Sequence, residues 1–153
     1  FERHVFWRRL VEHRIDPHPL SKKYPGIVTQ QRGGYAGGLS EYTRLSVARQ
    51  IHPAAAYESC SWGAFQIMGY HWEYLGFASI DDFLELNRSG EAGQLSVFVR
   101  FILADTNLHR ALKTKKWSTF SKLYNGPAYA ENLYDVKLSR AYSRHVEMLK
   151  DAA

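Results

Sequence analysis

Apolar residues recur at helical spacing along most of this chain. Within residues 1–13 one face of a short helix would carry Val5, Phe6, Leu10 and Val11. Ser40 and Ser79 are predicted to be the N-caps of two further helices, and Ser89 to open a third. Other helices are predicted to run from Pro53 to Glu58 and to cover 108–113, 117–124 and 129–149. The helix after Ser89 has the widest apolar face, formed by Leu95, Val97, Phe98, Val99, Phe101, Ile102 and Leu103. We therefore expect it to be the buried centre of the domain.

Glycine and proline interrupt this helical pattern. Residues 15–39 contain three prolines and five glycines, which predicts a long loop with a small hairpin around residues 27–29. The stretch from Ala64 to Met68 can be extended, and Asn125-Gly126-Pro127 ends a helix. Because no repeat or linker divides the chain, the pattern predicts one mainly α-helical domain over residues 1–153, with a small β-sheet or hairpin.

The net charge indicates which classes of partner the surface of this domain attracts. A formal net charge of +5 predicts attraction to polyanions, which include nucleic acid, anionic lipid and bacterial cell wall. The basic residues are scattered and form no base-reading motif, so we expect no nucleic-acid partner. The sequence contains no apolar run of about 18 residues, so we expect no membrane insertion. We expect the protein to be a monomer.

The cysteine and the histidines argue against a metal or a cofactor. Cys60 is the single cysteine, and we interpret it as a small buried residue and not as a nucleophile, although a nearby histidine would change that interpretation. The seven histidines show no ligand spacing such as H-x3-H. We therefore expect neither a metal site nor a cofactor.

A carboxylate candidate lies in the stretch "ESCSWGAFQIMG", residues 58–69. Glu58 ends a helix next to aromatic surface, where partial desolvation would favour its neutral form and suit it to donate a proton. A solvated charge or a local salt bridge is the alternative for a glutamate at a helix end. A second stretch, "LYNGPAYAENLYD", puts Tyr124 and Asn125 at another helix end, where a ring and an amide can bind a sugar. The alternative here is a core tyrosine followed by an Asn-Gly helix stop.

Together these motifs resemble a known family. Glu58-Ser59, the run from Gly63 to Met68, and Tyr124-Asn125-Gly126 are similar to the "ES … GLMQIM … YN" pattern of goose-type lysozymes and soluble lytic transglycosylases. The match is closer to the N-acetylmuramidase domains of phage endolysins, and it covers nearly the whole chain. The matching segments are residues 1–4, 33–38, 41–45, 58–69, 94–102 and 124–138.

The resemblance implies a lysozyme-like helical fold with a small sheet beside a glycan groove. It also implies a peptidoglycan hydrolase that cleaves the β-1,4 bond between N-acetylmuramic acid and N-acetylglucosamine. Glu58 and Glu2 are then the catalytic carboxylate candidates, and Gln66, Tyr124 and Asn125 are the substrate-binding candidates. A lytic transglycosylase and a non-catalytic peptidoglycan-binding module are the alternatives.

Members of this family usually carry another helix, ending in its own Glu-Ser pair, ahead of the segment that matches residues 1–4. We therefore expect that this chain lacks an upstream helix, whose glutamate the resemblance makes a strong candidate for the general acid. Glu58 is either the acid itself or a buried partner that orients Gln66 and its loop while the upstream glutamate gives the proton. Glu2 is either a second carboxylate or water-positioning base, or a residue with no part in the reaction. The resemblance also implies synthesis in the host bacterial cytoplasm and action on the cell wall. A secreted effector is the alternative.

Overall fold

Helices form most of the structure, a computed structural model that describes residues 1–152, and the one sheet in this range has two strands. This confirms the mainly α class with a small sheet. The chain divides into two units, residues 1–100 and the residues from Phe101 onward, with the boundary inside α6 (Glu91–Ala104).

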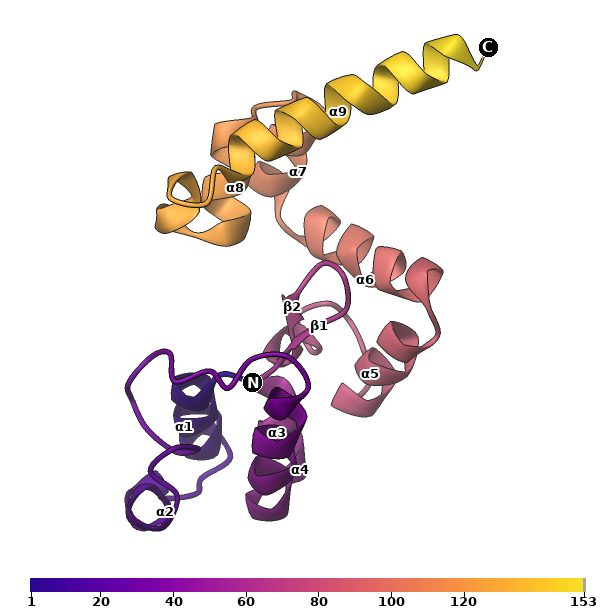
Figure 1. Ribbon diagram of the computed structural model, residues 1–153. Coiled ribbons are helices and arrows are strands. Elements are labelled where there is room, and N and C mark those ends of the chain that lie inside the picture. The colour runs from indigo at the N-terminus through magenta and orange to yellow at the C-terminus, as the bar shows by residue number, and fades with distance from the viewer. Residues whose placement is uncertain (153) are drawn as a thin grey trace. The chain divides into compact units, whose positions relative to one another are not determined.

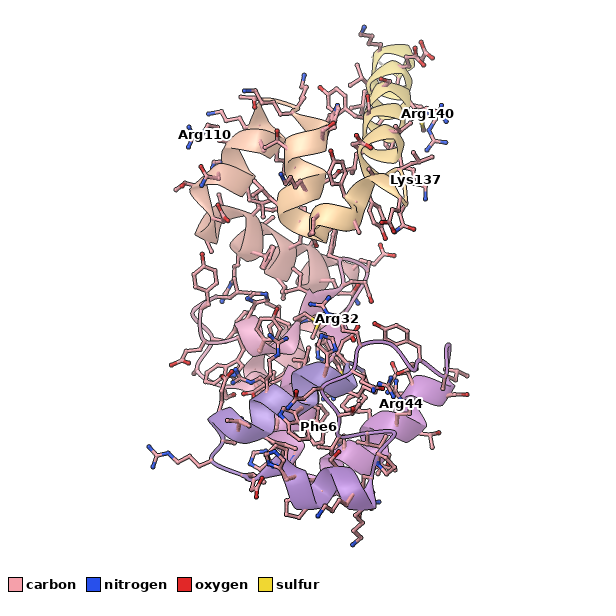
Figure 2. The ribbon with its side chains drawn as sticks, turned by 90° about the vertical axis from the view of Figure 1, so that its left-hand side faces the viewer. Phe6, Arg32, Arg44, Arg110, Lys137 and Arg140 are labelled. Atoms are coloured by element: carbon pink, nitrogen blue, oxygen red, sulfur yellow. The ribbon has the colours of Figure 1, made fainter. Side chains whose placement is uncertain are left out.

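The first unit is built around α1 (Arg3–Glu12), α3 (Ser40–Ile51) and α4 (Pro53–Glu58), which Figure 1 shows in indigo and purple. Their apolar faces enclose a core that includes Phe6, one of the residues labelled in Figure 2. The other core residues are Leu10, Val28, Leu45, Ala48, Ala55, Ala56 and Cys60. The segments α2 (Pro17–Lys23), β1 (Ser61–Trp62), β2 (Ile67–Met68), η1 (Gly69–His71) and α5 (Ile80–Arg88) complete this unit with most of α6.

Local capping signals explain where several helices begin. Pro53 occupies the first turn of α4, where its missing N–H costs nothing, and the His52 side chain accepts a hydrogen bond from the Ala55 N–H. Ser79 caps α5 by accepting from the Asp82 N–H at 3.0 Å, as predicted. The prediction for Ser40 was wrong by one residue, because Leu39 occupies the cap position and Ser40 is the first helical residue.

The region predicted as one long loop contains a helix. α2 begins at Pro17, and the Asp16 side chain caps it by accepting from the His18 N–H at 3.0 Å. The number of prolines in this region predicts a loop, but Pro17 instead occupies the first turn of a helix, where proline is well tolerated. The hairpin predicted at residues 27–29 is also wrong. The sheet lies at residues 61–68, where Trp62 pairs with Ile67 and Ser61 pairs with Met68 in antiparallel register.

The prediction that α6 is buried on almost all sides was wrong. Val97 and Ile102 are buried, but the side chains of Leu95, Val99 and Leu103 are 50%, 43% and 58% exposed. The helix therefore packs through a narrow stripe and leaves apolar side chains on its surface. An apolar composition alone does not determine burial, since folded proteins expose much apolar surface.

The second unit contains α7 (Thr106–Lys113), α8 (Trp117–Asn125), η2 (Pro127–Ala130) and α9 (Tyr134–Asp151). The Trp117 ring contacts the Tyr142 ring at 5.4 Å, and Ser118 Oγ donates to Asp135 at 2.9 Å, so α9 packs on α8. The terminal helix was predicted to begin at residue 129 but begins five residues later, at Tyr134. Residues 127–130 form η2 instead, and the backbone of Leu133 has a left-handed conformation. Lys137 and Arg140 project from α9 in Figure 2.

Gly69 marks a close contact between η1 and the end of α4. A Cβ built at Gly69 would lie 2.3 Å from the Tyr57 carbonyl oxygen and 2.9 Å from the Glu58 Cα, and both are backbone atoms. We expect Gly69→Ala to lower the free energy of unfolding by about 2 kcal/mol or more, because the backbone must move to make room. Gly26→Ala is the matched control, since a Cβ there meets nothing within 4 Å. Urea unfolding of both variants checks this, and equal stabilities would contradict it.

Candidate functional site

The Glu58 side chain is 2% exposed at the C-terminal end of α4. Its Oε2 lies 2.8 Å from both Arg9 Nε and His13 Nε2, and its Oε1 accepts from Trp72 Nε1 at 3.0 Å. An ionised carboxylate has only acceptor sites, and these three groups can all donate to it. The structure therefore surrounds a buried carboxylate with donors.

The packing of α1 against α4 produces this arrangement. Arg9 and His13 are four residues apart at the end of α1, so both side chains leave the same face of that helix. Arg9 also pairs with Glu12, and the His13 ring lies 4.5 Å from the ring of His52. Trp72 reaches Glu58 from the residue after η1.

The donors decide the protonation state of Glu58. Burial alone would raise its pKa, but the hydrogen bonds from Trp72, His13 and Arg9 outweigh burial and hold the pKa below its ordinary value. Glu58 is therefore ionised at neutral pH and has no proton to donate. Of the two interpretations of Glu58, this geometry favours the buried partner over the general acid.

Glu2 occupies the cap position of α1, where its backbone N–H donates to the Ser59 carbonyl at 2.8 Å. This bond places Glu2 next to the end of α4. Its carboxylate accepts from the hydroxyl of Tyr35 at 2.8 and 3.0 Å, and His4 Nδ1 lies 3.4 Å away. Burial lowers the pKa of His4, and the Glu2 charge opposes that shift in part. The Glu2 side chain is 23% exposed, so solvent or a ligand can reach it.

Gln66 lies in the turn between β1 and β2, in a left-handed conformation with φ of 53°. Its Oε1 accepts from Ser61 Oγ at 2.8 Å, and its Nε2 donates to the Gly63 carbonyl at 2.8 Å. Both ends of the amide are therefore held by the hairpin, and the side chain has a fixed direction.

This hairpin forms one wall of a cleft of about 400 Å³ in the first unit. The cleft combines three aromatic rings with polar groups. Its lining residues are Phe1, Gly38, Glu41, Tyr42, Leu45, Cys60, Ser61, Trp62, Gly63 and Gln66. Rings that cover apolar faces and polar groups that make hydrogen bonds suit a carbohydrate ligand.

Glu41 is a site residue that the sequence interpretation missed. Its Oε1 accepts from the N–H groups of Ala36 and Gly37 at 2.6 and 3.1 Å, and its Oε2 accepts from Arg44 at 2.7 Å. Burial opposes these bonds, which nevertheless hold the pKa of Glu41 below its ordinary value. The available signal was its position one residue into a helix that follows a glycine-rich loop.

Tyr124 and Asn125 lie in the second unit, at the C-terminal end of α8. The Tyr124 ring stacks on the Phe120 ring with centroids 5.5 Å apart and makes a T-shaped contact with the Phe101 ring at 5.6 Å, and burial raises the pKa of Tyr124 to about 12. The phenol therefore stays protonated. Asn125 is exposed, and Gly126 follows it with a φ of 86°. Glu2, Glu58 and Gln66 all belong to the first unit.

Cys60 is buried, as predicted, and burial raises the pKa of its thiol to about 11. A thiol with this pKa is not a nucleophile at neutral pH. Within residues 1–152 no group of three or more histidine, cysteine, aspartate or glutamate side chains could hold a metal ion. In the same range, no helix has both the length and the apolar character to cross a membrane.

Comparisons with known proteins match almost the whole chain. The family model described as Muramidase: N-acetylmuramidase matches residues 1–146. The structure is similar to the "Crystal structure of Burkholderia AP3 phage endolysin", with 51% sequence identity and a TM-score of 0.89. That similarity covers 96% of this chain and 56% of the endolysin chain, so the present chain spans just over half the length of that relative. No curated protein matches the chain by sequence.

Proposed function

We propose, from the premise that this chain belongs to the N-acetylmuramidase family, that it hydrolyses peptidoglycan. The family resemblance drawn from the motifs is confirmed, and so is the lysozyme-like fold class. The bond cleaved would be the β-1,4 bond between N-acetylmuramic acid and N-acetylglucosamine. The observation that carries this proposal is the cleft beside the hairpin, where Gln66 lies among aromatic rings and hydroxyl groups.

We assign different roles to the two glutamates. Glycoside cleavage uses one carboxyl group that gives a proton and a second that is ionised. Glu58 is buried and ionised with three donors around it, so we propose that it holds α1, α4 and the segment after η1 in register. Glu2 is partly exposed and follows Phe1, which lines the cleft. We propose Glu2 as the second carboxylate, which activates water or stabilises positive charge on the sugar.

The substrate-binding residues proposed are Gln66, Tyr124 and Asn125. Gln66 is presented to the cleft with its amide fixed by Ser61 and Gly63, so it needs little reordering when a sugar binds. The packed ring of Tyr124 and the exposed amide of Asn125 offer a stacking surface and a hydrogen-bonding group at one helix end. We also propose that the protein is a monomer, made in the cytoplasm of the host bacterium, and that it acts on the bacterial cell wall.

A wall-lysis assay tests the proposal against a binding module. We expect the protein to reduce the turbidity of a purified peptidoglycan suspension and to release soluble fragments. The same suspension is sedimented in parallel to measure how much protein it carries down. Sedimentation of the protein with stable turbidity would overturn the hydrolase proposal and favour the binding module.

A further inference from the structure

The hydroxyl of Tyr35 lies between the two oxygens of the Glu2 carboxylate, at 2.8 Å from one and 3.0 Å from the other. The Glu2 side chain makes no capping hydrogen bond to α1, so its own helix does not fix its direction. A donor shared between both oxygens selects one orientation of the carboxylate. Tyr35 itself belongs to the glycine-rich loop of residues 33–38, in which no residue is assigned a catalytic role above.

This loop is attached to α1 on the N-terminal side of Tyr35. Arg3 Nη2 donates to the Arg32 carbonyl at 3.0 Å. The same guanidinium lies against Gly34, because a Cβ built there would be 2.5 Å from Arg3 Cζ. Gly34 also has a φ of 72°, a conformation that other residues rarely adopt. Glycine at this position therefore allows both the turn of the loop and the contact with Arg3.

The loop is attached to α3 on the C-terminal side of Tyr35. Glu41 accepts the N–H groups of Ala36 and Gly37, which directly follow the tyrosine. Arg44, one turn later on α3, holds the other oxygen of Glu41 at 2.7 Å. The Tyr35 side chain is 59% exposed, so packing alone does not determine its position. The backbone attachments on both sides place it instead.

We propose that Tyr35 is a positioning residue for Glu2. Arg3 and Glu41 fix the loop on either side of Tyr35, and the loop delivers the phenol hydroxyl to the carboxylate that acts on the substrate. This inference rests on the proposed role of Glu2. Its consequence is that a segment outside the list of catalytic candidates sets the geometry of the reaction, since small displacements of a catalytic group lower the rate strongly.

Tyr35→Phe removes the hydroxyl and little else. We expect kcat for lysis of purified peptidoglycan to fall about tenfold or more, the loss that one hydrogen bond to a charged group predicts. KM and the melting temperature should stay the same, since the ring and the loop remain. Tyr74→Phe is the matched loss of an exposed tyrosine hydroxyl, because the Tyr74 residue is 60% exposed and does not line the cleft. A Tyr35→Phe enzyme with wild-type kcat, measured beside an impaired Glu2→Gln enzyme, would overturn the inference.

Substitutions at two neighbouring glycines distinguish loss of the Arg3 contact from backbone strain. Gly33 and Gly34 have φ values of 74° and 72°, so alanine strains the backbone equally at both positions. Only at Gly34 would the new Cβ meet Arg3, because the position at Gly33 has nothing within 4 Å. We expect Gly34→Ala to lower kcat severalfold more than Gly33→Ala. Equal losses in the two variants would contradict the role of the Arg3 attachment.

The contact itself can be tested without measuring activity. Partial desolvation of the hydroxyl and then the hydrogen bond to Glu2 raise the pKa of Tyr35 above its ordinary value. Ultraviolet titration of the wild type and of Tyr35→Phe isolates the ionisation of this one phenol. In Glu2→Gln it should ionise at lower pH, and an unchanged titration would overturn the contact and the inference. Full lysis by Glu2→Gln together with a shifted titration would instead show that the proposed role of Glu2 is wrong.

Discussion

Glu58→Gln will lower the free energy of unfolding by about 3 kcal/mol, the usual result of removing one partner from a buried ion pair. The substitution is nearly isosteric, so the loss comes from charge and hydrogen bonding and not from packing. An amide can accept from one donor well, but it also brings an N–H₂ group toward Arg9 and His13. Of its two ion pairs with Glu58 and Glu12, the Arg9 guanidinium, which is 20% exposed, then retains the one with Glu12.

Glu12→Gln is the matched control for this experiment. It removes the same charge from the other partner of Arg9, but the Glu12 side chain is 58% exposed. A pair exposed to this degree contributes little, so we expect a change of at most about 0.5 kcal/mol. Urea unfolding at neutral pH compares the two variants. If both variants were as stable as the wild type, Glu58 would not anchor the packing of α1 against α4.

The stability difference between wild type and Glu58→Gln should also depend on pH. The pKa of Glu58 in the folded protein is below its ordinary value of 4.5, so the folded state binds fewer protons than the unfolded state. The stabilisation is therefore complete above the unfolded pKa and is lost as pH falls through the folded pKa. We expect the difference to shrink as pH falls below about 4.5. A difference that is constant from neutral pH to pH 3 would contradict an ionised Glu58.

Glu2→Gln will reduce the rate of wall lysis by about 100-fold or more, the range usual for loss of a positioned acid or base. Binding to sedimented peptidoglycan should not change, because the amide keeps the shape of the side chain. The stability should change by less than about 0.5 kcal/mol, since the Glu2 side chain is not a helix cap. Tyr35 can still donate to the amide oxygen, so the loop should remain in place.

Glu12→Gln on the same helix again serves as the control and should lyse wall at the wild-type rate. Thermal unfolding of both variants shows whether each is folded at the assay temperature. Wild-type lysis by Glu2→Gln would remove Glu2 from the reaction. If Glu2→Gln lost both wall binding and lysis, Glu2 would be assigned to substrate binding and not to the chemical step.

The helix that carries Glu58 was predictable, but the environment of Glu58 was not. Pro53 and the apolar run after it indicated α4 with the bounds that the structure shows. The donors to Glu58 lie 49, 45 and 14 residues away in sequence, so no local pattern could indicate them. Partial desolvation suggested a raised pKa, whereas the three donors reverse the direction. Burial predicts a neutral acid only where the surroundings supply no compensating charge.

The loop that contacts Glu2 also has partners that local sequence patterns could not indicate. The glycines of residues 33–38 indicated a loop, and Gly33, Gly34, Gly37 and Gly38 all have positive φ angles in the structure. Nothing local indicated that Tyr35 would bond to Glu2, 33 residues earlier, or that Glu41 would hold the loop. Likewise, the apolar positions of α6 predicted a helix correctly, but only the tertiary packing determined which side of it is buried. Local patterns therefore indicated most of the helices, whereas contacts between residues far apart in sequence form the site.

Analysis of the product ends tests the muramidase proposal most directly. Purified peptidoglycan is digested, and the soluble fragments are examined by mass spectrometry with and without borohydride reduction. Hydrolysis of the bond proposed above leaves N-acetylmuramic acid at the reducing end, so each fragment should gain two hydrogens on reduction at that sugar. Fragments that end in a non-reducible anhydro sugar, or in N-acetylglucosamine, would contradict the account.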